Sequence, residues 1–141
     1  MTTKEYLKSA RNLQVIIDGK TERVQQLRAL AQSTSATLDG MPRGNGDKDR
    51  LGNVVAAIVD FSREIARDTA LLIERQRDIQ ALIARVQDTD YRTVLELYYL
   101  NGWRWHEVAL RMNYSSRHIF RLHEEALRAV ESVALNGSSK T

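Results

Sequence analysis

Two long stretches of the chain carry seam positions that recur in alternating steps of four and three residues. Steps of this kind, kept over many turns, are typical of helices that pack along a coiled-coil seam. The stretches flank a loop segment rich in glycine, asparagine and aspartate around Pro42, the only proline of the 141 residues. We therefore expect an all-α chain with a long antiparallel, coiled-coil-like helical hairpin over residues 1–88 and a loop at about 39–48. The seam positions are Tyr6, Ala10, Leu13, Ile17, Lys20, Val24, Leu27, Ala31, Thr34 and Leu38 before the loop, and Leu51, Val55, Ile58, Ser62, Ile65, Thr69, Leu72, Gln76, Ile79, Ile83 and Val86 after it.

Both seams contain residues that an ideal coiled coil would avoid. Gly19, a weak helix former beside the charged Lys20, predicts a kink or break in the first helix. Ser62, Thr69 and Gln76 are spaced by heptads, and polar seam residues lower stability while fixing register and the number of partners. We interpret the hairpin as a spacer or dimerisation arm in a homo-oligomer, most simply a dimer. The alternative is a docking surface for a polymerase or another regulator.

The composition excludes several classes of protein. The chain has no cysteine, which rules out disulfides and thiolate metal sites and agrees with a reducing cytoplasm. Its first residues lack the apolar core of a signal peptide, and no apolar run approaches the roughly 20 residues that cross a bilayer. A soluble, cytoplasmic protein is therefore expected. The net charge of +3 permits a nucleic-acid partner without requiring one.

No constellation for catalysis or for a cofactor stands out. The sequence lacks a phosphate-binding glycine loop, a cysteine nucleophile and a His/Ser/Asp arrangement in a recognisable context. His118 and His123 are five positions apart and so lie off a shared helical face, which argues against a metal pair. We expect a protein that is not an enzyme, with no catalytic residue, no cofactor and no metal.

A polar cluster at residues 87–90 indicates a helix boundary. A new helix is expected over about 91–100, ended by Asn101 and Gly102, with the glycine as a left-handed cap. We therefore place a second domain at 89–135 and a flexible tail at 136–141, and expect a fragment that begins near Thr89 to fold by itself.

The segment from Trp105 to Leu122 has the spacing of a helix-turn-helix. Ala109 supplies the small residue that the helix crossing needs, Asn113 tolerates a positive φ in the turn, and Ser115 can cap the second helix. The positions expected to face inward are Val108, Met112, Tyr114, Ile119 and Leu122.

With that core face assigned, the outward face of the second helix carries Ser116, Arg117, His118 and Arg121. They lie in its N-terminal half, where such helices enter the major groove. Arginine can bind guanine O6 and N7 bidentately, and serine can serve a base or a phosphate. The alternative for the two arginines is a solvated face paired with Glu124 or Glu125.

The remaining aromatic and histidine residues of this region have more than one interpretation. His118 is either a phosphate contact or a bystander, whereas His123 is expected to pack or to point to solvent. Trp103 and Trp105 are expected to pack against the 91–100 helix, and base stacking is the alternative.

The residues at 91–109, 112–123 and 126–127 resemble region 4 of the sigma-70 factors. They are more similar still to small phage and prophage proteins built on that region, a group that includes the ArpU and RinA late-gene regulators. The long N-terminal helices and the loop at 38–42 are similar to the same group, so the resemblance spans most of the chain.

The resemblance implies a transcription regulator in a bacterial host cell that binds promoter-like double-stranded DNA, with contact to RNA polymerase as a further expectation. It places Arg117 and Arg121 where sigma region 4 reads bases of the −35 element. Residues beside them in the predicted DNA site are Ser115, Ser116, His118 and Phe120, and Arg104 and Arg111 are placed nearer the DNA backbone.

The chain departs from the sigma pattern at two of these positions. Arg104 stands where a capping threonine is common, and Arg117 stands where an acidic residue is common. It also has no counterpart of the region that melts the −10 element, so we do not expect a self-sufficient sigma factor. One alternative is a DNA-packaging protein like the small terminase subunits of phages, although those usually place the DNA-binding unit first and here it comes last. The other alternative is a helical scaffold without DNA binding.

Overall fold

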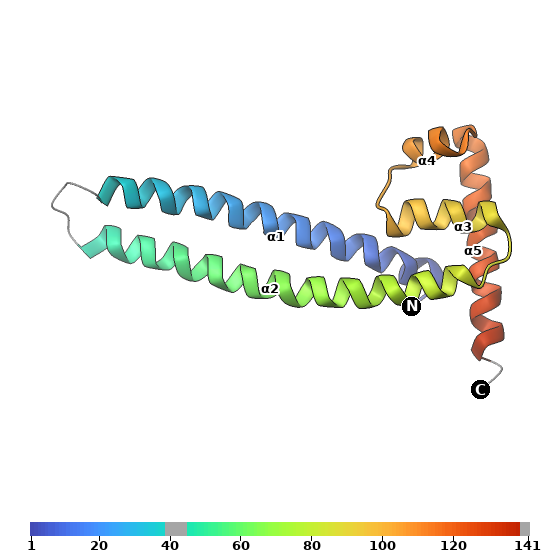
Figure 1. Cartoon of the computed structure of the whole chain (residues 1–141), viewed down its shortest axis with the longest axis horizontal. Helices are drawn as coiled ribbons and strands as arrows, with labels where there is room; N and C mark the ends of the chain where they lie inside the picture. The colour runs from blue at the N-terminus through green and yellow to red at the C-terminus, as the bar shows by residue number, and fades with distance from the viewer. Residues whose placement is uncertain (39–44, 139–141) are drawn as a thin grey trace. The chain divides into compact units, whose positions relative to one another are not determined.

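A computed structural model describes residues 1–38 and 45–138, and the expected all-α architecture is confirmed over these residues. The helices are α1 (Thr3–Leu38), α2 (Asn45–Ala84), α3 (Thr89–Leu95), the π-helical turn η1 (Glu96–Leu100), α4 (Trp105–Met112) and α5 (Ser116–Ser138) (Figure 1). The chain divides into two compact units, residues 14–71 and residues 1–13 with 72–141.

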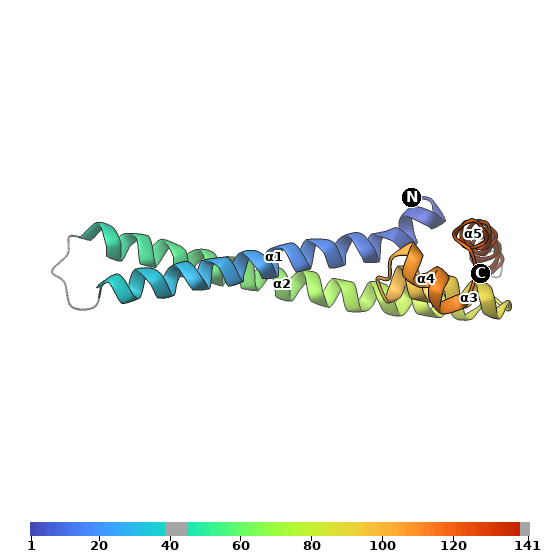
Figure 2. The same cartoon turned by 90° about the horizontal axis from the view of Figure 1, so that it is seen from above.

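The unit at 14–71 contains the part of the predicted hairpin that includes the connection between its two helices. In this unit α1 and α2 run antiparallel side by side (Figures 1 and 2). Ile17 and Val24 of α1 and Val54 of α2 are buried along the seam. Lys20 also lies at a seam position, and its ammonium group is 2.7 Å from a carboxylate oxygen of Asp68 and 3.8 Å from one of Glu64. The charge in the seam is therefore matched by carboxylates of the facing helix.

Three details of the predicted hairpin are wrong. The first helix is not broken at Gly19, since α1 is continuous from Thr3 to Leu38. Val55 is 47% exposed and Val54 is the buried residue, although both positions fit the alternating steps of three and four between Leu51 and Ile58. The loop was expected to reach residue 48, but α2 already begins at Asn45, and residues 39–44 lie outside the described part.

The unit formed by residues 1–13 and 72–141 has a core to which every helix contributes. Leu7 and Ala10 come from α1, and Leu72, Ile79 and Ile83 come from α2. The buried apolar residues that follow α2 in the sequence are Val86, Val94, Leu95, Tyr99, Val108, Ala109, Ile119, Leu122, Ala126 and Val130. This division does not coincide with the boundary at 88/89 that the polar cluster predicts.

Arg11 links the start of α1 to the later helices of the same unit. Its guanidinium group donates to the backbone carbonyls of Tyr98 (2.6 Å) and Trp103 (3.1 Å). The same group lies 4.0 Å from the centroid of the Tyr98 ring, within the range of a cation–π contact. One side chain thereby holds both ends of the connection between η1 and α4.

The termini of the later helices follow the expected signals. Asp88 caps α3 by accepting the Tyr91 N–H at 3.0 Å, and Gly102 has the predicted left-handed conformation with φ of 76°. The predicted tail at 136–141 is helical as far as Ser138, and residues 139–141 lie outside the described part. Within the described ranges, no helix combines the length and apolarity that a membrane span requires.

Candidate nucleic-acid interface

The turn between α4 and α5 has the geometry that its sequence predicts. Asn113 is in the left-handed region (φ 60°, ψ 43°), a conformation that asparagine adopts more readily than other non-glycine residues. The Tyr114 N–H donates to the Ala109 carbonyl at 3.0 Å, which closes the end of α4. Ser115 then caps α5, because its hydroxyl oxygen accepts the His118 N–H at 3.1 Å.

The predicted register of α5 is confirmed. Ile119 and Leu122 are buried, as are Val108 and Ala109 of α4. The outward face in the N-terminal half of α5 is exposed and consists of Ser116, Arg117, His118, Phe120 and Arg121. Five of the residues predicted for the DNA site are therefore accessible on one helix.

Arg117 and Arg121 are one turn apart on this face, so their side chains emerge side by side. Neither makes a side-chain hydrogen bond or an ion pair with any residue that the structure describes. The alternative pairing with Glu124 or Glu125 is thus not found among those residues, and Glu125 instead accepts a hydrogen bond from the Tyr91 hydroxyl at 3.1 Å. Both guanidinium groups are available to a ligand.

The two arginines predicted to lie near the DNA backbone are exposed at opposite ends of α4. Arg104 occupies the N-cap position in an extended conformation, and its side chain makes no capping hydrogen bond. Arg111 lies 4.8 Å from the centroid of the Trp103 ring, a cation–π contact that orients its guanidinium group.

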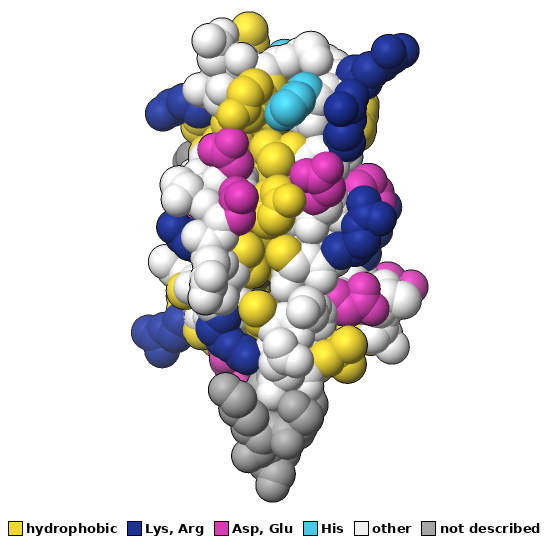
Figure 3. Space-filling view, turned by 90° about the vertical axis from the view of Figure 1, so that its right-hand side faces the viewer, with side chains coloured by type: hydrophobic (Ala, Val, Ile, Leu, Met, Phe, Trp, Pro, Cys, Tyr) yellow, Lys and Arg dark blue, Asp and Glu magenta, His cyan; other side chains and the backbone are white. Residues whose placement is uncertain are grey.

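Tyr114 ties the turn to α3 and gives His118 a neighbour. Its hydroxyl donates to the Asp90 carboxylate at 2.8 Å, and its ring centroid lies 4.3 Å from that of His118. The hydrogen bond to Asp90 raises the pKa of Tyr114. On the face drawn in Figure 3, a strip of hydrophobic side chains has carboxylates beside its middle, and Lys and Arg side chains lie along both edges of the face.

A cluster of aromatic residues supports this arrangement from inside the unit. The Trp105 ring stacks on that of Tyr98, with centroids 3.7 Å apart and an interplanar angle of 12°. The Tyr99 hydroxyl and His123 Nε2 are 2.7 Å apart and buried. Trp105 therefore packs as predicted, and of the two interpretations of His123 the structure shows packing.

The pairing of Tyr99 with His123 was missed by the sequence analysis. The signal was available, because His123 lies four residues after the buried Ile119 and three before the buried Ala126, on the inward face of α5. Burial lowers the pKa of His123 to about 4 and raises that of Tyr99, so both groups are neutral near pH 7.

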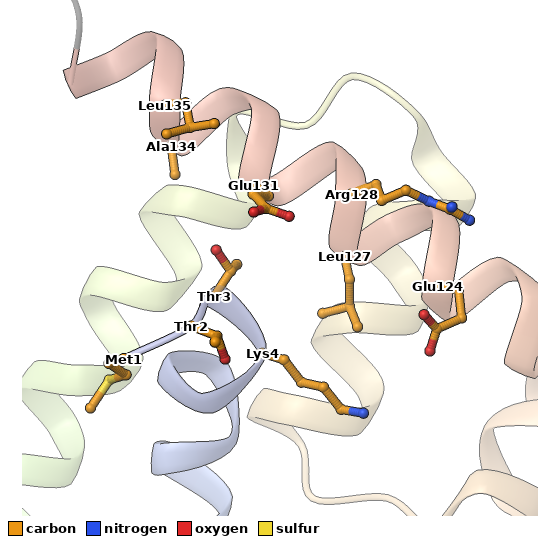
Figure 4. Close-up of a pocket in the computed structure, with 10 residues that line it drawn as sticks. All are labelled: Met1, Thr2, Thr3, Lys4, Glu124, Leu127, Arg128, Glu131, Ala134 and Leu135. Carbon is orange, nitrogen blue, oxygen red and sulfur yellow. The ribbon is translucent and has the colours of Figure 1, made fainter.

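A wide groove of about 510 Å³ lies between the first residues of α1 and α5 (Figure 4). Leu127 and Glu131 of α5 line it opposite Thr2 and Thr3, and Lys4 extends toward the part of α5 that carries Glu124. Across the described residues, no three His, Asp or Glu side chains are placed to share a metal ion.

Over residues 1–38 and 45–138, these features define a helical protein with a long hairpin and with an exposed, arginine-bearing helix in the compact unit of residues 1–13 and 72–141. The chain belongs to the family described as "Protein of unknown function (DUF1492)", whose model matches residues 32–131. No curated protein and no solved structure matches the chain.

Proposed function

We propose that the protein is a sequence-specific, double-stranded-DNA-binding transcription regulator that reads the major groove with the N-terminal half of α5. The observation that carries the proposal is the pair of exposed arginines, Arg117 and Arg121, which are one turn apart and engage no described residue. Helix-turn-helix proteins present base-reading side chains from this part of their second helix.

The neighbouring groups suit contacts to phosphate. The first amides of α5 are directed outward at the helix N-terminus, where anions are favoured. Ser115 uses its oxygen as the helix cap and keeps its hydroxyl hydrogen to donate, and Ser116 is exposed beside it. Arg104 and Arg111 supply further positive charge on α4, in keeping with positioning contacts that carry no sequence information.

The class of regulator that we propose rests on the resemblance to sigma-70 region 4 and to phage late-gene regulators. On that basis α4 and α5 form a helix-turn-helix of the sigma region 4 type, the chain acts in the cytoplasm of a bacterial host, and it contacts RNA polymerase at promoter-like DNA. Arg117, a basic residue at a position that is often acidic in sigma factors, favours a target that differs from the −35 element.

The test is a competition assay at two salt concentrations, using duplexes selected from random DNA and scrambled versions of them. Arg117→Ala or Arg121→Ala should lose about 1–3 kcal/mol of binding free energy on the selected site and relax base preference. Arg104→Ala and Arg111→Ala should weaken all duplexes alike and flatten the salt dependence. Arg63→Ala, which removes an exposed arginine from α2, is the matched control. Equal losses on both kinds of duplex would assign Arg117 and Arg121 to phosphate only.

We further propose that the chain binds DNA as a homodimer through the hairpin. Ser62 and Thr69 are half-buried in the seam between α1 and α2, so the proposed dimer uses exposed apolar residues of the hairpin instead, among them Val55 and Val59, one turn apart on α2. Sedimentation at tens of micromolar should show a dimer that Val55→Asp with Val59→Asp converts to monomer. A ring of eight or more copies would favour DNA packaging over transcription.

A further inference from the structure

A second, smaller cavity of about 200 Å³ opens between the start of α1 and the aromatic cluster. It is lined by two lysines of α1, Lys4 and Lys8, by the rings of Trp105 and Phe120, and by Glu124. All of these residues belong to the compact unit of residues 1–13 and 72–141. Its volume is below the roughly 300–1,000 Å³ of sites for drug-sized ligands, so it can enclose only part of a larger ligand, such as one ring system or one charged group.

Phe120 is the exposed ring of the aromatic wall. The Trp105 ring stacks on Tyr98 at 3.7 Å and is met edge-on by His123 at 4.5 Å, and the Phe120 ring stands 5.8 Å from it at an angle of 52°. Phe120 is 53% exposed, and it lies between the outward-facing Arg117 and Arg121. An exposed aromatic face next to a second ring is the platform on which proteins stack nucleobases.

The positive charge of the cavity comes from its lysines. Lys4 and Lys8 are exposed, one turn apart on α1, and neither makes an ion pair with any residue that the structure describes. The inner Tyr99 hydroxyl and His123 Nε2 form a hydrogen bond with each other, so each of these two polar atoms already has a partner. Glu124 is the carboxylate of the lining, and it can accept a hydrogen bond from an amino group of a base.

We propose that this cavity binds a nucleotide, with the base against Phe120 and Trp105 and the phosphate at Lys4 and Lys8. The base stacks on the exposed ring of Phe120, and the two ammonium groups bind the anion. The nucleotide is either free in solution or an unpaired residue of a nucleic acid, since both present the same ring and phosphate. The site shares Phe120 with the predicted DNA-contacting face of α5, whereas Lys4 and Lys8 come from α1 and lie outside that face.

The experiment uses the fluorescence of Trp105 in the full chain. The chain has two tryptophans, and Trp103→Phe leaves Trp105 as the reporter in the cavity. The probes are deoxyguanosine and deoxyadenosine monophosphates, the matching nucleosides, inorganic phosphate and a short single-stranded oligonucleotide. Saturable quenching is expected with a monophosphate or with the oligonucleotide. The nucleosides should bind with an affinity at least about tenfold lower, and inorganic phosphate alone should not quench the fluorescence.

The two sources are separated by the same titrations. Saturation by a mononucleotide assigns the site to a free ligand, and saturation by the oligonucleotide alone assigns it to an unpaired base. The absence of saturable quenching by every nucleotide probe up to about 1 mM overturns the proposal. Because no duplex is present, this result leaves the proposed regulator function untouched.

Variants of the lining complete the test. Phe120→Ala should weaken nucleotide binding about tenfold, and Phe120→Leu, which keeps apolar bulk without a ring, should weaken it similarly. Lys4→Ala combined with Lys8→Ala should abolish the advantage of monophosphate over nucleoside. The control is Lys48→Ala, an exposed lysine outside the lining. Unchanged affinity in both the phenylalanine and the lysine variants overturns the proposal.

Discussion

The hydrogen bond between the Tyr99 hydroxyl and His123 Nε2 joins η1 to α5 inside the core of the C-terminal unit. His123 is 5% exposed, and its ring also meets Trp105 edge-on at 4.5 Å. Burial lowers the pKa of His123 from its ordinary 6.5 to about 4, and the charge of Glu124 opposes this shift while that of Lys4 adds to it. Protonation of His123 in the core therefore makes the stability of the unit depend on pH.

We predict acid destabilisation that is specific to His123. The folded state favours the neutral ring, so this contribution is fully present above about pH 6.5 and is lost as the pH falls toward 4. The loss at pH 4 is on the order of 3 kcal/mol of unfolding free energy. Urea unfolding from pH 7.5 to 4 should show a shallower pH dependence in His123→Phe than in the wild type. His106→Phe, at an exposed position, should keep the wild-type slope, and equal slopes in all three proteins would contradict the assignment.

At the scale of an element, the turn from α4 to α5 depends on the left-handed Asn113. A β-branched residue is strained in this conformation, whereas glycine is not. Asn113→Val should therefore lower the unfolding free energy by about 1–3 kcal/mol, and Asn113→Gly should stay within about 1 kcal/mol of the wild type. Urea unfolding of the three proteins measures this difference. If valine and glycine are equally tolerated, the turn has another conformation in solution.

The elements also show which features a sequence pattern can predict. Spacing alone located both hairpin helices, the Asn113 turn and the inward face of α5, because each depends on residues within one or two turns. It could not choose between the adjacent Val54 and Val55, which satisfy the same periodicity. It also could not predict that Arg11 donates to carbonyls 87 and 92 positions away, because no local pattern marks such a contact.

At the scale of the whole molecule, the main difference lies in what completes the C-terminal core. The sequence break at 87–90 is real, since α2 ends at Ala84 and α3 begins at Thr89. Yet Leu7, Ile79 and Ile83 are fully buried in the same compact unit as the later helices. A local break in helical periodicity therefore need not be a boundary between cores.

The last prediction concerns how much of the chain this unit needs in order to fold. Residues 89–141 alone would lose the cover supplied by Leu7, Ile79 and Ile83, and a fully buried aliphatic side chain contributes about 1.5–3 kcal/mol. Far-ultraviolet circular dichroism should therefore show a cooperative thermal transition for the full chain and little or none for residues 89–141.

The matched control is a chain in which a short glycine-serine linker replaces residues 14–71. It retains residues 1–13 and 72–141, which form the compact unit, and removes only the second unit, residues 14–71. Its transition should be as cooperative as that of the full chain, because its core is complete and a short linker adds little closure entropy. If residues 89–141 instead melt cooperatively by themselves, the boundary indicated by the polar cluster is the true one, and the contributions of Leu7, Ile79 and Ile83 are dispensable.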